Sequence, residues 1–326
     1  MTGVPTLAYA NPPEWLSGGF WAELLAFSLL NPPTGWDGDL VARVMPDAGL
    51  ARKETIVQAA VAAEGFPTPA VRGWSGPVSR VGRAFMIMDR ARGAPLLSGL
   101  GGIGVVAAMP RLVRRIPDAL AISMARLHAL DPEPVRDQLR DVPDVATSVL
   151  GLLHGLRTWA GRCRRVDLAD AAGWLINHPP PLAPDVVCHG DLHPFNLLAE
   201  GDAEPAVLDW SAAVLAPRTY DVAFTSLLLS EPPIAVSGPL RPLVRATGRR
   251  LARRFVRLYE QHSNVTINID EQRWYQAAVC LRALVEVAGW VNDGVVEARQ
   301  GHPWLVSGGA FATRLSLATS VSVKPR

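Results

Sequence analysis

A short polar cluster inside an apolar stretch constrains this chain more than any other feature. In residues 186–210, VVCHGDLHPFNLLAEGDAEPAVLDW, His189 and Asp191 follow one apolar run, and Asn196 stands five positions after the aspartate. A second apolar run ends at Asp209. Two short buried strands joined by a turn would place these polar groups at one edge. The stretch therefore predicts a site built from carboxylate and amide oxygens.

The spacing of these groups matches the catalytic loop of protein kinases, H-R-D-x-x-x-x-N, followed later by a metal-binding aspartate. His189, Asp191 and Asn196 fall on this spacing, and Asp209 stands at the later position. Gly190 occupies the place of the loop arginine. The chain here resembles the aminoglycoside phosphotransferase and choline kinase family, whose pattern is H-G-D-x-x-x-x-N followed by a strand that ends in Asp.

The resemblance implies a bilobal, protein-kinase-like α+β fold. An N-terminal lobe at residues 1–91 would bind nucleotide through an antiparallel β-sheet with one helix. A larger, mainly α-helical lobe at residues 92–326 would carry catalysis and bind the acceptor. The implied cofactors are ATP (or GTP) and Mg²⁺. Asp191 would orient the acceptor hydroxyl, while Asn196 and Asp209 would hold the metal.

The acceptor class follows from the same resemblance. Family members phosphorylate a hydroxyl group of a small molecule, and aminoglycoside-, macrolide-, choline- and homoserine-like acceptors all fit. Fold alone does not select among them.

The N-terminal strands are expected to form a meander. Three strand-like segments between residues 15 and 45 are separated by turn residues. In the resembling family the first glycine turn covers the nucleotide phosphates, and Ser17, Gly18 and Gly19 match that position. Glycine lets backbone N–H groups approach phosphate oxygens closely, although a Gly-Gly pair is also an ordinary hairpin turn.

Arg43 lies on the third predicted strand, where kinases carry a phosphate-binding lysine. The two lysines of the chain, Lys53 and Lys324, do not fall on this strand. Arginine stays charged and binds phosphate through two donors, so the role is preserved. The predicted partner is Glu54, because it shares the apolar face of a helix at residues 50–64 and a carboxylate there needs a cation. The alternative is a surface glutamate beside basic neighbours.

Two further strands are expected at residues 70–74 and 84–89. The chain then runs into the segment that, by resemblance, is the hinge between lobes. There the backbone of Met88, Asp89 and Arg90 would receive the adenine ring.

The second lobe reads as helical, with a long helix at residues 105–131 and further helices between 144 and 178. His128 near the end of the first helix is interpreted as a packed core histidine. His189 would support the catalytic loop through hydrogen bonds. Asp221, at the start of another helix, would act as a cap or support for that loop.

Two long helices are expected in the C-terminal third, at about 240–262 and 270–299. The second places Glu286, Trp290 and Asp293 on one face. By resemblance these helices line the acceptor pocket, where carboxylates around an indole would suit a cationic acceptor. The alternative is a solvated face with one anchoring tryptophan.

Two other functions remain open. His189, Asp191 and His193 alternate and could share one strand face as the ligands of a metallohydrolase, although Pro194 would break that strand. The other alternative is a catalytically silent nucleotide-binding protein on a kinase scaffold.

Composition limits the partners. The 326 residues are 49% hydrophobic and 19% charged, as in ordered globular proteins. A net charge of +2 favours neither a nucleic-acid nor a membrane partner. Three widely spaced cysteines and the lack of a signal-like N-terminus predict a reducing, cytoplasmic location. No sequence signal selects an oligomeric state.

Overall fold

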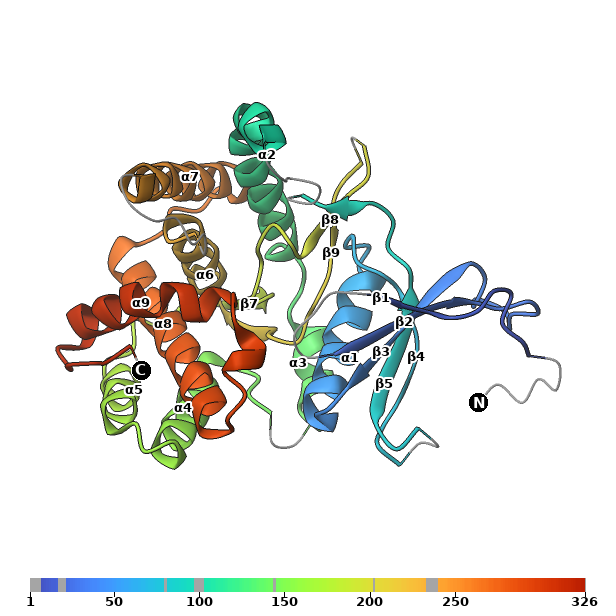
Figure 1. Cartoon of the computed structure of the whole chain (residues 1–326), viewed down its shortest axis with the longest axis horizontal. Helices are drawn as coiled ribbons and strands as arrows, with labels where there is room; N and C mark the ends of the chain where they lie inside the picture. The colour runs from blue at the N-terminus through green and yellow to red at the C-terminus, as the bar shows by residue number, and fades with distance from the viewer. Residues whose placement is uncertain are drawn as a thin grey trace. The chain divides into compact units, whose positions relative to one another are not determined.

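The computed structural model describes residues 7–16, 22–78, 81–96, 103–142, 145–201, 203–232 and 240–325, with backbone alone for 103–112 and 240–241. The chain divides into two compact units, and Figure 1 labels most of their helices and strands. The first unit comprises residues 1–99, 130–145 and 194–213, and the second comprises 100–129, 146–193 and 214–326. The first unit thus includes residues 92–99, 130–145 and 194–213, which lie beyond the predicted N-terminal lobe of residues 1–91.

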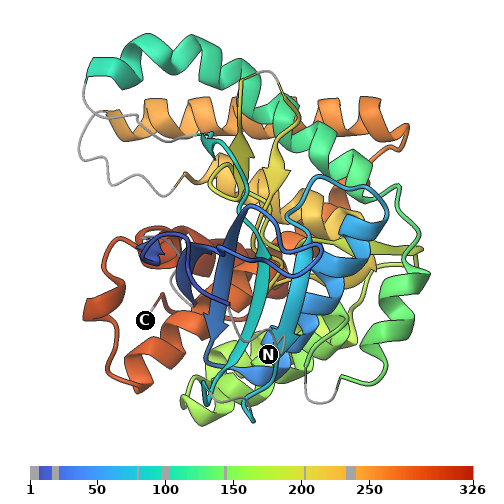
Figure 2. The same ribbon diagram turned by 90° about the vertical axis from the view of Figure 1, so that its right-hand side faces the viewer.

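The first unit contains a five-stranded antiparallel sheet in the order β1-β2-β3-β5-β4, with β2, β3 and β5 at its centre (Figure 2). Its strands are β1 (Glu14–Leu16), β2 (Glu23–Ser28), β3 (Asp39–Met45), β4 (Val71–Ser75) and β5 (Ala84–Asp89). The predicted N-terminal sheet is therefore confirmed. Successive side chains of a strand point to opposite faces, so Arg43 shares its face of β3 with the buried Val41 and Met45.

One helix, α1 (Ala48–Ala63), contacts strands β3, β4 and β5 of the sheet. It begins at Asp47, whose side chain accepts a hydrogen bond from the backbone N–H of Leu50 at 2.8 Å. Such a cap satisfies an amide that has no partner in the first turn. Glu54 is buried on this helix, as its position on the apolar face predicted.

A small second sheet completes the first unit. Its order is β6-β8-β9, from β6 (Ala94–Pro95), β8 (Leu197–Ala199) and β9 (Ala206–Val207). The two apolar runs, residues 186–188 and 206–208, were expected to form two strands joined by a turn. They do not form one hairpin, because β9 pairs with β8 instead. The short helix α3 (Glu133–Leu139), which contacts α1, was not predicted either.

The second unit is mainly α-helical, as predicted. Its helices are α2 (Ile103–Leu127), α4 (Val149–Arg162), α5 (Val166–Asn177), α6 (Thr219–Ser230), α7 (Leu240–Ser263), α8 (Ile269–Asn292) and α9 (Pro303–Thr319), with a 3₁₀ turn at Glu297–Arg299. Two strands, β7 (Asp185–Cys188) and β10 (Val214–Pro217), pair antiparallel. In the part of the chain that is described, no helix combines the length and apolar character needed to cross a bilayer.

Helix α8 packs against α4, α5, α6 and α9 and contributes a large part of the buried core of the second unit. The prediction that this helix continues to residue 299 is wrong. It ends at Asn292 with Asp293 as its C-cap, and Gly294 then adopts φ +70°. Glycine tolerates this left-handed conformation, which ends a helix. Helix α9, which follows, was not expected.

Candidate active site

In the first unit, Arg43 joins two carboxylates that come from distant parts of the sequence. Its Nη2 donates a hydrogen bond to Asp209 Oδ1 at 2.9 Å. Its Nε lies 3.0 Å from Glu54 Oε1, as an ion pair whose N–H does not follow the line of a hydrogen bond. The side chains of Arg43 and Glu54 are 8% and 1% exposed, so this pair is removed from water. The structure thus brings together the predicted residues Arg43, Glu54 and Asp209.

Burial and the neighbouring charges have opposite effects on the pKa values of Arg43 and Glu54. Burial raises the pKa of Glu54 to about 7, although the neighbouring Arg43 cation lowers it. Burial also disfavours the Arg43 cation, but Glu54 and Asp209 outweigh this effect and raise the pKa of Arg43. The guanidinium is therefore charged at every ordinary pH. One buried cation with two carboxylates leaves a local excess of acidic groups.

Asp209 and Asn196 lie at the same end of two neighbouring strands in the small second sheet. Asn196 directly precedes β8 and Asp209 closely follows β9, and the backbone N–H of Leu208 donates to the Asn196 carbonyl at 2.9 Å. Asp209 adopts φ +65°, a conformation that costs energy for a residue with a side chain. The hydroxyl of Ser211 donates to Asp209 Oδ1 at 2.8 Å.

These residues suit a small, hard divalent cation. Mg²⁺ is bound through one or two carboxylates together with phosphate oxygens and water. Asp209 has a carboxylate side chain that is 26% exposed, and Asn196, which directly precedes the neighbouring strand β8, has an amide oxygen that could serve as a second ligand. The chemistry of this donor set fits magnesium better than zinc, which prefers sulfur and imidazole ligands.

In the second unit, helix α6 holds the loop that carries Asp191. The carboxylate of Asp221 accepts hydrogen bonds from the backbone N–H groups of His189 and Gly190, both at 2.7 Å. Farther along the loop, the Thr225 hydroxyl donates to the carbonyl of Leu192 at 2.7 Å. Asp221 is fully buried, so both amides are bound to a carboxylate away from water, where such bonds are strong.

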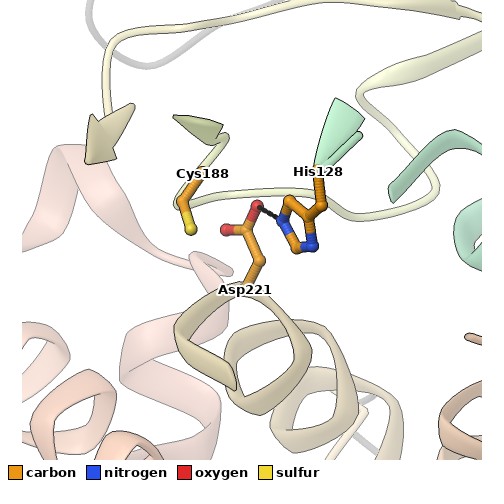
Figure 3. Close-up of side chains that lie close together, drawn as sticks. All are labelled: His128, Cys188 and Asp221. Carbon is orange, nitrogen blue, oxygen red and sulfur yellow. Dashed lines mark hydrogen bonds and ion pairs between the residues drawn. The ribbon is translucent and has the colours of Figure 1, made fainter. Parts of the chain in front are cut away.

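Behind this loop, His128 bonds to Asp221 and to Tyr259. The distances are 3.2 Å from His128 Nε2 to Asp221 Oδ2 and 2.8 Å from His128 Nδ1 to the Tyr259 hydroxyl. Figure 3 shows the His128 imidazole facing the Asp221 carboxylate, and Cys188 on the opposite side of that carboxylate. The buried His128, predicted as a core histidine, thus joins α2 to the helix that supports the loop. Tyr259 was not predicted.

The ligand atoms of His128, Cys188 and Asp221 lie within 4.8 Å of one another, close enough to suggest a metal site. Their bonding argues against one. Both Asp221 oxygens accept backbone hydrogen bonds, and the imidazole nitrogens face Asp221 and Tyr259. Burial, with the nearby Asp221 charge, raises the pKa of the Cys188 thiol well above its usual value, whereas a metal needs the thiolate. The cluster is therefore a support for the loop.

The geometry expected for a metallohydrolase does not form. Strand β7 ends at Cys188, and Gly190 turns the chain with φ +74°. The backbone N–H of Asp191 donates to His189 Nδ1 at 3.2 Å, and His193 Nε2 lies 3.9 Å from Asp191 Oδ2. His189, Asp191 and His193 therefore do not share one strand face, and that part of the alternative is wrong.

The predicted hinge lies at the end of β5. The backbone N–H groups of Asp89 and Arg90 donate to the carbonyls of Ala70 and Asp39, and the Asp89 carboxylate binds Arg72 through two hydrogen bonds of 2.6 Å. A nucleotide base bound at Met88 to Arg90 would have to form hydrogen bonds with backbone groups other than these two N–H groups.

The predicted phosphate-covering turn, Ser17, Gly18 and Gly19, lies outside the described residues.

The predicted acceptor residues on α8 occupy different environments. Glu286 is largely buried and bonded within the protein. Trp290 is 3% exposed and packs edge-on against His302. Asp293 is exposed at the end of the helix. Of these three side chains, the structure leaves Asp293 at the surface, and the acceptor role of the set stays a prediction.

Asp191 belongs to the second unit, while Asn196 and Asp209 belong to the first. Their predicted convergence on one metal-nucleotide site stays a prediction.

Comparison with known proteins places the chain in a class. The model of the phosphotransferase enzyme family (APH) matches residues 34–259. The chain therefore belongs to the phosphotransferase enzyme family, and the resemblance inferred from the sequence is confirmed.

Solved structures of that kind share the fold. A protein assigned as an aminoglycoside phosphotransferase from Ralstonia eutropha JMP134 aligns with a TM-score of 0.67 and 20% identity over 98% of this chain and 95% of its own. A thermostable APH(4)-Ia mutant with ADP and hygromycin B gives 0.57 and 18% over 97% and 96%. Macrolide 2'-phosphotransferase MphH from Brachybacterium faecium gives 0.54 and 15% over 96% and 94%. The predicted α+β, protein-kinase-like fold is confirmed. A search of curated proteins found no match.

Proposed function

We propose that this protein transfers the γ-phosphoryl group of ATP (or GTP) to a hydroxyl group of a small molecule, with Mg²⁺ as cofactor. The observation that carries the proposal is the contact of the buried Arg43 with both Glu54 and Asp209. In protein kinases, a strand cation paired with a helix glutamate and a metal-binding aspartate must both be in place for phosphoryl transfer, and these three residues match that set. Membership of the phosphotransferase enzyme family supports the same conclusion.

The residues of the first unit would bind the nucleotide. Arg43, oriented by Glu54, would contact the phosphates, and Asn196 and Asp209 would hold the metal. Magnesium, when bound, neutralises charge on the phosphate oxygens. The backbone at Ser17 to Gly19 and at Met88 to Arg90 would cover the phosphates and the base.

Asp191 would orient the hydroxyl of the acceptor. The transition state of phosphoryl transfer is loose, so a carboxylate of modest basicity suffices. Positioning and charge neutralisation then supply most of the rate. The bonds from Asp221 to the backbone of His189 and Gly190 would keep the loop in place.

The acceptor is proposed as a small molecule with a free hydroxyl group. The thermostable APH(4)-Ia mutant, a structural neighbour, forms a ternary complex with ADP and hygromycin B, which supports a nucleotide and a small-molecule acceptor here. Asp293, exposed at the end of α8, is a carboxylate that a cationic acceptor would contact. Glu286 and Trp290 are largely buried and would support that surface from the interior of the protein.

A panel of hydroxyl compounds tests the proposal. Aminoglycosides, macrolides, choline, homoserine and sugars are incubated with Mg²⁺ and ATP or GTP, and release of the nucleoside diphosphate is measured. We expect release with at least one class of acceptor. Nucleotide binding without any turnover, including hydrolysis, would instead indicate the catalytically silent alternative. Absence of nucleotide binding would contradict both functions.

Asp191→Ala tests the catalytic residue. Turnover is expected to fall about 100-fold or more, as is usual when a proton-accepting group is lost, while the dissociation constant of ATP stays within about threefold. Asp137→Ala is the control, because Asp137 forms an exposed ion pair with Arg140 on α3 and should leave both quantities unchanged. Unchanged turnover of the Asp191 variant would remove the residue from its proposed role.

A further inference from the structure

Arg282, in the middle of α8, is a largely buried cation that the proposed mechanism does not use. Its side chain is 15% exposed, and its Nε forms an ion pair with Glu286 Oε1 at 2.9 Å. Its Nη1 donates a hydrogen bond of 3.0 Å to the carbonyl of Gly190, in the loop that carries Asp191. Removing a guanidinium from water is costly, so its partners indicate what it does.

The ion pair is anchored by the C-terminal helices. Glu286 Oε2 accepts a hydrogen bond from Trp304 Nε1 of α9 at 3.0 Å, while Oε1 accepts from Arg282. Burial disfavours the Arg282 cation, but Glu286, Tyr220 and Asp191 more than offset this and raise its pKa. Arg282 is thus permanently charged. Its Nε is bound by Glu286, and its Nη1 points toward the loop that carries Asp191.

The carbonyl that Arg282 binds belongs to the peptide group that leads into Asp191. A peptide group is planar, so fixing its oxygen and its N–H fixes the direction in which the next residue leaves. Arg282 holds the oxygen of this group, and His189 Nδ1 accepts the hydrogen bond from its N–H. On the other side of Gly190, Asp221 accepts the hydrogen bond from the Gly190 N–H.

This peptide needs such a restraint because Gly190 precedes it. Gly190 adopts φ +74°, and glycine has access to more backbone conformations than any other residue. Its peptide could otherwise rotate and turn Asp191 away.

We propose that Arg282 is a positioning residue, which fixes the peptide plane between Gly190 and Asp191 and thereby the direction of the Asp191 carboxylate. The catalytic consequence rests on the proposed function. The restraint on the loop does not, and it can be measured without turnover.

Three variants separate positioning from folding. Arg282→Met removes the contact but leaves Glu286 buried without its cation, which destabilises a protein. The double variant Arg282→Leu with Glu286→Leu removes both charges, and such replacements usually preserve the fold. Arg165→Met is the matched control, because Arg165 pairs with Asp167 at 2.7 Å and donates to the Lys324 carbonyl at 2.6 Å, away from this loop.

Hydrogen-deuterium exchange of the peptide covering residues 186–196 is the first readout. We expect exchange to rise about tenfold or more in the double variant, since a hydrogen bond to a charged group is lost, and to stay within about twofold in the control. Unchanged exchange in the double variant, or an equal rise in Arg165→Met, would overturn the proposal.

Acceptor-independent hydrolysis of ATP with Mg²⁺ is the second readout. The double variant should lower kcat about tenfold or more with the KM for ATP within about threefold, because the nucleotide contacts are untouched. Arg282→Lys should recover part of kcat, since an ammonium group can still donate to the Gly190 carbonyl. Faster exchange with unchanged kcat would overturn the positioning role. A wild-type protein that shows turnover neither in this assay nor with the acceptor panel would overturn the proposed function, while the exchange data still decide whether Arg282 restrains the loop.

Discussion

At the scale of single residues, the charges around Arg43 define the candidate site. A strand, a helix and a loop that lies 166 positions farther along the chain each contribute one charged side chain. Arg43 stands on the strand where protein kinases carry a lysine. Its planar guanidinium can contact two carboxylates at once, which a lysine ammonium does less well. The two carboxylates outnumber the single cation, which suits a divalent metal at the exposed side of Asp209.

Arg43→Ala should weaken ATP binding about 10- to 100-fold while the affinity for adenosine changes by less than about threefold, because charge-assisted bonds to phosphate are lost. Isothermal titration calorimetry measures both. Arg136→Ala is the control, since Arg136 forms an ion pair with the exposed Glu133 on α3, outside the proposed nucleotide contacts. Equal losses for ATP and adenosine would show that Arg43 does not contact phosphate.

Asp209→Ala should abolish the part of ATP affinity that depends on magnesium. The reason is the loss of the carboxylate that would ligate the ion. Calorimetry with Mg²⁺ and with a chelator gives the difference directly. A variant that still binds ATP about tenfold more tightly with Mg²⁺ than without it would contradict this assignment.

At the scale of elements, α8 is the helix around which the second unit packs. Its approach to α4 is very close at Gly289, where an added Cβ would lie 2.3 Å from a ring atom of Trp159. Only a glycine permits this contact without movement of the indole. The same helix carries Arg282, so its placement bears on the loop that carries Asp191 as well as on the core.

Gly289→Ala should destabilise the protein by about 1–3 kcal/mol, because overpacking outweighs the better helix propensity of alanine. Gly309→Ala is the matched control, since Gly309 lies in α9, is exposed and has no atom within 4 Å of an added Cβ. It should stabilise by up to about 1 kcal/mol. Denaturant unfolding measures both changes. Stabilisation by Gly289→Ala would mean that the helices separate at little cost.

At the scale of the whole molecule, buried titratable groups make the free energy of unfolding depend on pH at both ends of the range. Burial lowers the pKa of His302 to about 4. Burial also raises the pKa of Tyr220 and of Cys280 to about 12. The unfolded chain titrates these groups near their ordinary values, and each difference is a change in stability.

Stability should fall as pH decreases from about 6.5 to 4, because the unfolded chain binds a proton at His302 that the folded protein rejects. The loss from this residue is on the order of 2 to 3 kcal/mol. Denaturant unfolding at a series of pH values measures it. His302→Asn retains a side chain that can accept the capping hydrogen bond from the Trp304 N–H. This variant should reduce the dependence of the free energy of unfolding on pH in this range. An unchanged slope in the variant would exclude His302 as its source.

Stability should also fall above about pH 9, because the unfolded chain releases protons from thiols and phenols that the folded protein keeps. The free energy of unfolding of Cys280→Ala, measured in the same way, should fall less steeply above about pH 9 than that of the wild-type protein. An equally steep fall would mean that Cys280 makes no contribution.

The amino-acid sequence by itself determined the features that depend on local chemistry. The spacing from His189 to Asp209 predicted the family, and the apolar face at Glu54 predicted its burial. Alternation and turn residues predicted the N-terminal sheet, because side-chain direction in a strand has a period of two.

The tertiary structure alone decided which distant segments meet. β7 pairs with β10 rather than β9, Trp290 packs against His302 at the N-cap of α9, and Arg282 reaches Gly190 from 92 positions away. An arginine and a glutamate four positions apart on a helix usually form a surface pair, so the sequence contained no signal that distinguished Arg282. Such contacts arise from the packing of whole helices and strands, which depends on every buried surface together and is not encoded in the spacing of a few neighbouring residues.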